Sequence, residues 1–336
     1  MKKSRKISFL IAAHNEEKII GKALKCLTEL PYPNYEVIIG LDGCTDKTLD
    51  IVKYFQRKKP KIFKYIELNE RKGKAHVVNL IFPYSRGEII IIHDADWILK
   101  INRKDDLIKI ISWFDDPKLG GIAESFPVEW EPERIKTNNS MAFLAIAWTS
   151  YFWIEYLKKK FSIRINGNLY TNPENKNFPF ELNIMRRKLY NKNETLGDAW
   201  ERAQDVLEQK YLLRLVEDQS LPRMHASYHE ARFKDIFKQK IRTAISREQI
   251  KQKYPYLNFN FFNFHFPLLL FLLKNLYMVK RIKAVFGVFI WLVIMTYSIL
   301  LHEIKRLNAN IKQGWITERY RQGTYKSWVL RAKRTF

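Results

Sequence analysis

The segment that decides the fold is Ile89-Ile90-Ile91-Ile92-His93-Asp94-Ala95-Asp96-Trp97. Four consecutive β-branched residues predict a strand that is buried on both faces, as in a parallel sheet. The run ends at two aspartates one residue apart, and in open α/β sheets ligands bind beyond the carboxyl ends of the strands. Close carboxylates repel each other unless a cation neutralises them, so Asp94 and Asp96 are candidate ligands for a hard divalent ion that carries a diphosphate. Taken alone, the pair is more typical of a turn with solvated acids.

Strands and helices alternate around this segment. Buried strands are predicted at residues 7–13, 35–41, 62–68 and 89–93, and helices at 19–30, 48–55 and 75–82. This order predicts an α/β fold with a right-handed, doubly wound, mostly parallel sheet and helices on both faces. Further along, the pattern predicts a helix at 106–114, a strand at 120–128, a helix at 141–156, a loop at 166–180 and helices at 198–215 and 235–249.

The chain is strongly basic. Lys and Arg number 59 against 35 Asp and Glu, a formal net charge of +24. Such a charge favours an anionic partner, either nucleic acid, an acidic membrane surface or a phosphorylated substrate. The basic residues are spread along the chain without a nucleic-acid-binding motif, so we expect no nucleic acid partner. Cys26 and Cys44 form no metal-binding pattern, and the apolar run after the basic N-terminus is too short for a signal peptide, which predicts a cytoplasmic N-terminal domain.

The composition changes near residue 257. The segment 257–273 carries no charge but contains Asn, His and Pro, and 284–301 is an uncharged run of 18 residues, roughly 27 Å long as a helix. A buried core helix is the alternative to a transmembrane helix, and the flanking basic residues favour the membrane. The tail 303–336 is basic, which places it in the cytoplasm by the positive-inside rule. One span, two spans and a hairpin that does not cross all stay open.

These segments divide the chain into a catalytic domain at 1–250 and a membrane-associated region at 251–336. The region comprises an interfacial or re-entrant segment at 257–273, a transmembrane helix at 284–301 and the basic tail. The predicted location is the cell membrane, with the catalytic domain on its cytoplasmic side.

Polar residues follow several predicted strands at the same edge of the sheet. Acids there accept hydrogen bonds from a base or ribose, lysines support phosphate charge, and an aspartate pair holds a metal on the diphosphate. Each piece alone is typical of a turn, a solvated loop or a helix cap, and their shared edge favours a nucleotide-diphosphate site. Its candidate residues are Asn15, Glu16, Asp42, Lys72, Lys74, Asp94 and Asp96.

With these motifs, residues 7–249 resemble the inverting family 2 glycosyltransferases of the GT-A fold. The family's Asn-Glu pair matches Asn15-Glu16, and its Asp-Asp-Gly-Ser-x-Asp turn matches Leu41 to Asp46, with Leu41 in place of the first Asp. Its Gly-Lys-Ala…Asn helix resembles Gly73 to Asn79, and its Asp-x-Asp matches Asp94 and Asp96.

Later motifs resemble those of the membrane-linked synthases of this family. They are Glu155-Tyr156, Arg186-Arg187, Gln204-Asp205 for the Glu-Asp motif, Leu212 to Leu215 for Leu-x-x-Arg-Leu, and Gln239 to Arg242 for Gln-x-x-Arg-Trp. Thr243 replaces the Trp, which in processive synthases helps to hold the acceptor sugar. This departure disfavours a cellulose- or hyaluronan-type polymerase.

The resemblance implies a single inverting displacement. Mg²⁺ or Mn²⁺, held mainly by Asp96 with Asp94, neutralises the leaving diphosphate. Asp205 is the expected base for the acceptor hydroxyl, with Asp198 as its rival, and Gln239 and Arg242 cover the diphosphate. The expected donor is a UDP-sugar, since Asp42 suits a pyrimidine, or a GDP-sugar. The expected acceptor is lipid-linked or a membrane-proximal saccharide.

Other functions are compatible with the sequence. Within the class, the alternatives are a polyprenyl-phosphate sugar synthase and a processive polysaccharide synthase. A lipid phosphate acceptor, already ionised, needs no strong base. A sugar-phosphate nucleotidyltransferase requires a Gly-rich basic loop after the first strand, where this chain has His14-Asn15-Glu16-Glu17. Outside enzymes, a basic membrane scaffold with a degenerate site is the alternative, and metal-dependent binding of a nucleoside diphosphate separates the two.

Overall fold

The computed structural model describes residues 4–123, 140–171, 180–218, 221–226, 232–257, 262 and 265–308. The chain forms two compact units, which are described separately. The first comprises Met1–Ser125, Phe161–Glu194 and Asp198–Ser227, and the second Phe126–Lys160, Thr195–Gly197 and Tyr228–Phe336.

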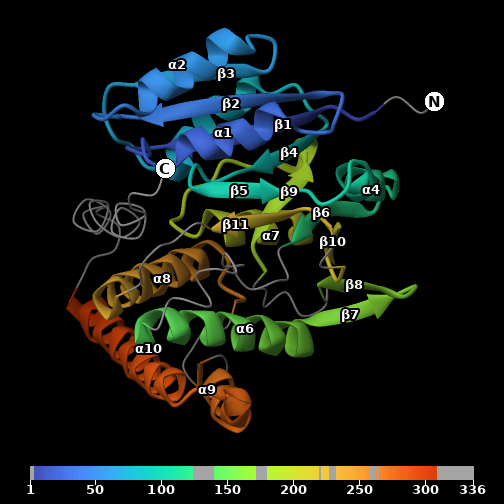
Figure 1. Ribbon diagram of the computed structural model, residues 1–336. Coiled ribbons are helices and arrows are strands. Elements are labelled where there is room, and N and C mark those ends of the chain that lie inside the picture. The colour runs from blue at the N-terminus through green and yellow to red at the C-terminus, as the bar shows by residue number, and fades with distance from the viewer. Residues whose placement is uncertain are drawn as a thin grey trace. The chain divides into compact units, whose positions relative to one another are not determined.

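The first unit is built on a nine-stranded sheet with the order β3-β2-β1-β4-β9-β6-β10-β8-β7. Strands β3, β2, β1 and β4 lie side by side and parallel (Figure 1). β10 is parallel to β6, whereas β9, β8 and β7 pair in the antiparallel sense. The predicted mostly parallel α/β sheet is therefore confirmed. Its strands are β1 (Ile7–Ala13), β2 (Tyr35–Asp42), β3 (Phe63–Leu68), β4 (Ile89–Ile92), β6 (Leu119–Ala123), β7 (Ser162–Ile165), β8 (Asn168–Thr171), β9 (Leu182–Arg186) and β10 (Leu212–Leu215).

Helices connect the parallel strands. They are α1 (Ile20–Thr28), α2 (Thr48–Lys58), α3 (Lys74–Ile81), α4 (Asp106–Ser112) and α7 (Asp198–Glu208), with short 3₁₀ turns η1 (Phe82–Tyr84), η2 (Trp113–Asp115) and η3 (Arg187–Leu189). Helix α3 lies so close to β2 that a Cβ atom on Gly40 would fall 2.2 Å from Val77, so only glycine fits there. A separate two-stranded sheet pairs β5 (Trp97–Lys100) with β11 (Arg223–Ala226).

Two sequence predictions are wrong in this unit. The helix predicted at 198–215 ends at Glu208, because Lys210 adopts a left-handed conformation (φ 63°) and Leu212–Leu215 form strand β10 beside β6. The loop predicted from residue 166 begins instead as the β7–β8 hairpin, whose turn residues Asn166 and Gly167 both have positive φ. Residues 172–179 lie outside the described part of the chain, as does the second half of the strand predicted at 120–128.

The end of the sheet opposite the polar edge contains a buried carboxylate. Glu36 on β2 is 1% exposed and accepts hydrogen bonds from the Ser8 hydroxyl, the Arg86 amide and the Lys64 ammonium, with Lys6 at 3.1 Å. Burial by itself raises the pKa of Glu36, but these hydrogen bonds outweigh it and hold the pKa below its ordinary value of 4.5.

The described secondary structure elements of the second unit are all helices. Its helices are α6 (Met141–Phe161, all but the last residue), α8 (Phe233–Lys253), α9 (Phe266–Asn275), η5 (Leu276–Met278) and α10 (Ile282–Asn308). The helices predicted at 141–156 and 235–249 are confirmed. Among the described residues, one helix segment, Ile282–Leu300, is long and apolar enough to cross a membrane.

We predict that Glu36→Gln lowers the free energy of unfolding by about 1–3 kcal/mol at pH 7, because a charged acceptor of several donors is lost in a buried place. The stabilisation comes from a depressed carboxylate pKa, so it is complete above the ordinary value and is lost as the pH falls through the native-state pKa. The gap between wild type and variant should therefore shrink in urea titrations carried out below pH 4.5.

The matched control for this measurement is Glu88→Gln. Glu88 pairs with Arg5, but its side chain is 58% exposed, so the change should stay within about 0.5 kcal/mol. An equal loss in both variants would contradict the role assigned to burial.

Candidate functional site

The two aspartates of the Asp-x-Asp motif follow β4 directly. The amide of His93 donates to the carbonyl of Leu10 on β1, which fixes the start of the turn. Asp96 is 6% exposed, and its Oδ2 atom has no hydrogen-bond partner among the described residues. Burial, and then the charge of Asp94, raise the pKa of Asp96 to about 7. The pair is therefore a place where positive charge is stabilised.

Lys74 supplies positive charge to this place from the first residue of α3. Its Nζ atom lies 2.5 Å from Asp94 Oδ1 and 3.5 Å from Asp198 Oδ2, at the start of α7. Burial alone lowers the pKa of Lys74, but the charges of Asp198 and Asp94 outweigh it and raise the pKa above its ordinary value. One ammonium group thus joins the ends of β4, α3 and α7.

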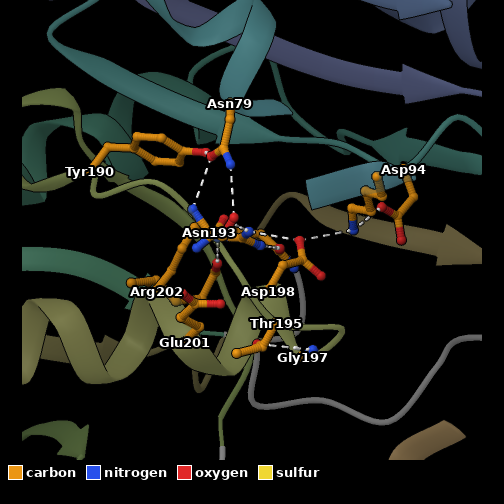
Figure 2. Close-up of polar contacts among 12 residues, drawn as sticks. Asn79, Asp94, Tyr190, Asn193, Thr195, Gly197, Asp198, Glu201 and Arg202 are labelled. Carbon is orange, nitrogen blue, oxygen red and sulfur yellow. Dashed lines mark hydrogen bonds and ion pairs between the residues drawn. The ribbon is translucent and has the colours of Figure 1, made fainter. Parts of the chain in front are cut away.

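Asp198 is oriented by Arg202, one turn further along α7 (Figure 2). Arg202 is fully buried, and its Nη1 atom donates to Asp198 Oδ2 at 2.7 Å and to Asn193 Oδ1 at 2.9 Å. The other guanidinium nitrogens donate to the Leu182 carbonyl and to Asn183 Oδ1, both on β9. The sheet thereby fixes the carboxylate that faces Lys74.

The same network reaches back to α3. Asn79 donates to the Asn193 carbonyl, and its own side-chain oxygen accepts from the Tyr190 hydroxyl and the Asn193 amide, as Figure 2 shows. Helix α3 is thus tied to the chain before α7 through Asn79, six residues after Gly73. Both ends of the site are held by hydrogen bonds between elements that are distant in sequence.

The turn after β2 is held to the loop before α3. Asp42 is 3% exposed, and its two carboxylate oxygens accept from the amides of Lys72 (2.5 Å) and Gly73 (2.8 Å). Gly43 has φ 58°, and a Cβ atom there would fall 2.5 Å from the Arg71 amide nitrogen, so glycine is required. The structure therefore uses Asp42, a predicted donor-binding residue, to shape this loop.

The turn after β1 meets the same region. Asn15, at φ 53°, accepts from the Thr45 amide at 2.7 Å and donates to the Thr45 hydroxyl at 3.0 Å. The Glu16 amide donates to the Thr48 hydroxyl at 2.7 Å. The turns after β1 and β2 thus form one edge, as the order of motifs predicted. Lys72 points its half-exposed ammonium at Glu70, 2.8 Å away.

The remaining predicted residues lie elsewhere. Asp205 is buried on α7 seven residues after Asp198, about 10 Å further along the helix axis, and its carbonyl accepts from the Gln209 side chain. The Leu-x-x-Arg-Leu pattern that supported Asp205 is strand β10. Gln239 and Arg242 belong to α8 in the second unit, so their predicted contact with a donor stays a prediction.

Sequence reasoning missed Arg202 and Asn193. Their hydrogen bonds join residues from β9, α7 and the segment between them, and no local sequence pattern predicts such a network. One signal was present, because Asp198 and Arg202 stand four residues apart at the start of a helix, a spacing at which opposite charges meet.

The residues fit a divalent ion that a ligand helps to hold. Asp94 and Asp96 offer carboxylate oxygens, and one of them, Asp96 Oδ2, is buried with no hydrogen-bond partner in the described ranges. Within the described ranges, no group of three or more His, Cys, Asp or Glu side chains is arranged around a metal position. An ion bound here would take further oxygen ligands from water or from a bound phosphate.

Comparisons with known proteins agree on one family. The model for glycosyl transferase family 2 matches residues 8–194, more than half of the chain. A probable glycosyltransferase, YdaM, of Bacillus subtilis (strain 168) is 35% identical over 139 residues, which cover 38% of this chain and 31% of that protein. The β-monoglucosyldiacylglycerol synthase of Nostoc sp. (strain PCC 7120 / SAG 25.82 / UTEX 2576) is 33% identical over 144 residues, 42% of this chain and 30% of the relative. The matched segments thus span about a third of the length of these relatives.

One solved structure resembles nearly the whole chain. The mannosyltransferase PcManGT from Pyrobaculum calidifontis, in complex with GDP-Man and Mn²⁺, aligns with a TM-score of 0.53 at 18% identity. The alignment covers 98% of this chain and 86% of the other. At this identity the likeness establishes the shared fold.

We predict that Asp42→Ala lowers the free energy of unfolding by about 1–3 kcal/mol, because two amides lose their acceptor in a buried place. It should also speed cleavage by trypsin after Arg71 and Lys72. Glu70→Ala is the control, since the Glu70 side chain is 76% exposed and, among the described residues, its polar contact is with the Lys72 side chain. Unchanged proteolysis in Asp42→Ala would contradict the anchoring role.

Proposed function

We propose that this chain, which belongs to glycosyl transferase family 2, transfers a sugar from a nucleotide-diphosphate sugar to an acceptor held at a membrane. The observation that carries the proposal is the convergence of Asp94, Asp96, Lys74 and Asp198 at the carboxyl edge of the parallel sheet. Displacement of a diphosphate by a hydroxyl needs three kinds of group. They are acids that hold a cation, a lysine that stabilises phosphate charge, and a further carboxylate.

A divalent ion, Mg²⁺ or Mn²⁺, is proposed to bind Asp96 and Asp94. When bound, it would act as a Lewis acid that stabilises negative charge on the leaving diphosphate. The buried Oδ2 atom of Asp96 supports this assignment. The absence of a third protein ligand among the described residues suits an ion that the diphosphate itself completes. The Mn²⁺ in the mannosyltransferase complex is compatible with it.

Asp198, rather than Asp205, is the base that the geometry favours. Its Oδ2 atom lies 3.5 Å from Lys74 Nζ, the same ammonium that contacts Asp94 at 2.5 Å, whereas Asp205 lies about 10 Å further along the helix axis. Asp198 would take the proton of the acceptor hydroxyl as that oxygen forms its bond to C1 of the sugar and the bond from C1 to the diphosphate breaks. The charge of Lys74 would support the phosphate oxygens as they become more negative.

The donor is proposed to be a UDP-sugar or a GDP-sugar. Its nucleoside would lie along the turns after β1 and β2, where Asn15, Glu16 and Asp42 are found, and Lys72 would be available to its phosphates. Gln239 and Arg242 on α8 are proposed to contact the diphosphate or acceptor. GDP-Man in the solved neighbour supports a nucleotide-sugar in this kind of fold.

The acceptor is proposed to be lipid-linked or a saccharide close to the membrane, with the catalytic unit on the cytoplasmic side. The apolar segment Ile282–Leu300 supports association with a membrane. Among the relatives, one is named a β-monoglucosyldiacylglycerol synthase and another, from Staphylococcus epidermidis, a poly-β-1,6-N-acetyl-D-glucosamine synthase, so the named products include a glycolipid and a polysaccharide.

The decisive experiment is transfer by detergent-purified protein, screened with UDP- and GDP-sugars, Mn²⁺ or Mg²⁺, and polyprenyl-phosphate or glycolipid acceptors. We expect metal-dependent release of one nucleoside diphosphate, and Asp96→Ala should abolish it while the unfolding temperature is kept. Turnover that survives in Asp96→Ala would overturn the metal assignment. An absence of turnover and of nucleotide binding would favour a scaffold with a degenerate site.

The base is tested by comparing Asp198→Asn with Asp205→Asn. We expect Asp198→Asn to lower the rate of transfer to a hydroxyl acceptor by about 10²–10⁴-fold, with donor affinity nearly unchanged. Asp205→Asn should change the rate only a few-fold. The reverse result would assign the base to Asp205, and activity of both variants on a lipid phosphate alone would mean that no base is needed.

Arg202 is a positioning residue for Asp198 in this proposal. Arg202→Lys keeps the charge but not the fork of hydrogen bonds, so we expect kcat to fall about 10–100-fold with little change in donor KM. The control is Arg186→Lys, since the Arg186 guanidinium also donates hydrogen bonds to backbone carbonyls, those of Phe114, Asp116 and Leu119. Equal losses of kcat in both variants would reduce Arg202 to a structural role.

A further inference from the structure

Helix α10 has two different faces. The residues on one face are buried, and those on the opposite face are exposed and apolar. The buried residues are Ala284, Gly287, Val288, Trp291, Leu292, Met295 and Ser298. The exposed residues, called the outer stripe below, are Ile282, Phe286, Phe289, Ile290, Val293, Tyr297 and Leu300. Both sets follow helical spacing, so the outer stripe runs along the whole apolar segment.

The buried face is covered by other helices of the same unit. At Gly287 the carbonyl oxygen of Met141 on α6 lies 2.4 Å from the place of a Cβ atom, so the helices touch. Helix α8, drawn in gold, meets the red C-terminal half of α10 in Figure 1. On the buried face, Lys240 Nζ on α8 lies 4.4 Å from the centre of the Trp291 ring. Phe237 on α8 also stacks on Tyr297, so α8 partly covers the outer stripe at that one residue, which is 53% exposed.

The contact between Lys240 and Trp291 fixes the depth that α10 can reach. Trp291 is the midpoint of the apolar segment Ile282–Leu300. If that segment crossed a bilayer, the ammonium of Lys240 would lie at the middle of the hydrocarbon, where a charged group is costly. Helix α8 also carries Lys238 and Arg242 on either side of Lys240, and these charged groups would be brought to a similar depth.

Within the described part of the chain, no carboxylate pairs with Lys240 to offset the cost of such a position. Among the described residues its ammonium makes the contact with Trp291 and no salt bridge. This side of α10 is therefore covered by α8, a helix that carries charged residues, and is not open to acyl chains.

We propose that α10 lies in the plane of the membrane, with the outer stripe in the acyl chains and α8 on the side away from them. The occupant of the outer stripe is thus a lipid surface. The inference rests on the membrane association proposed above. Of the three topologies that the sequence leaves open, it favours the hairpin that does not cross the membrane. An in-plane helix with one apolar face is the usual form of a monotopic anchor.

Charge complementarity supports a lipid occupant. The turn between α9 and α10 and its flanks carry four exposed basic residues, Lys274, Lys280, Arg281 and Lys283. They stand where α10 begins, within reach of anionic headgroups if the helix lies at the interface. Helix α9 adds exposed Phe266, Leu270 and Leu273, followed by Tyr277, which are suited to the same boundary. A crossing hairpin would instead carry these four charges through the bilayer.

Sidedness of the two ends of α10 tests the proposal in the full chain. Cys26 and Cys44 are replaced by Ser, and single cysteines are introduced by Lys280→Cys, by Lys305→Cys and, as a cytoplasmic reference, by Lys58→Cys. A membrane-impermeant maleimide is added to intact expressing cells and, separately, to permeabilised cells. We expect all three sites to be protected in intact cells and labelled after permeabilisation. Opposite behaviour of positions 280 and 305 would overturn the proposal.

Depth along the helix gives a second and independent measurement. Spin labels at the outer-stripe positions 282, 286, 290, 293, 297 and 300 are examined one at a time in vesicles of mixed phosphatidylcholine and phosphatidylglycerol. Relative collision rates with oxygen and a polar nickel complex should report one nearly constant depth. A depth that rises to a maximum near position 291 and falls again would show a spanning helix.

Neither measurement needs catalysis. The same labelling pattern is expected in Asp96→Ala, so loss of the proposed transfer activity and loss of the proposed topology are separate results. Retention of the unfolding temperature in detergent shows that each labelled variant is folded. If position 280 is protected and 305 labelled in intact cells, α10 crosses once; the reverse pattern means that α9 and α10 both cross.

Discussion

Two carboxylates at the end of a buried strand repel each other, and the ammonium of Lys74 offsets that repulsion. Lys74 contacts Asp94 at 2.5 Å and Asp198 at 3.5 Å, so one cation relates the ends of β4, α3 and α7. Each of these ends would be less stable alone, since like charges in a poorly solvated place raise the free energy of the folded state. The folded state therefore needs Lys74 close to these carboxylates for its own stability, whether or not the site is catalytic.

Such an arrangement works only if the acids cannot move apart. Arg202 meets this condition because it is fully buried and binds Asp198 and β9 at once. The hydrogen bonds of Asn79 to the segment before α7 hold the other side. A bound metal ion and diphosphate would add charges to this site. The Lys74 ammonium would then be surrounded by phosphate oxygens as well as carboxylates. Residues that are fixed beforehand do not have to reorganise when those charges arrive.

The sequence predicts the parallel half of the sheet well, because a run such as Ile89 to Ile92 reports burial on both faces by itself. The same run locates Asp94 and Asp96 at the carboxyl edge. The strands beyond β4 are harder to predict, since β9 and β10 lack a continuous β-branched run such as Ile89 to Ile92 and pair with strands that are distant in sequence. The choice between Asp198 and Asp205 as the proposed base depends on which end of α7 lies beside Lys74, and only the tertiary structure gives that information. Motif spacing alone favoured Asp205.

In the second unit, prediction from sequence is limited in a similar way for membrane segments. Mean hydropathy averages over all faces of a helix, so Ile282–Leu300 passes as a span whatever surrounds it. What decides its place is the chemistry that covers each face. A face that touches the ammonium of Lys240 at its midpoint and a face that carries Phe286, Ile290 and Val293 cannot share one solvent. In the proposed in-plane arrangement, the boundary between protein and lipid runs along the helix instead of across it, and an acceptor carried by lipid would lie at that boundary.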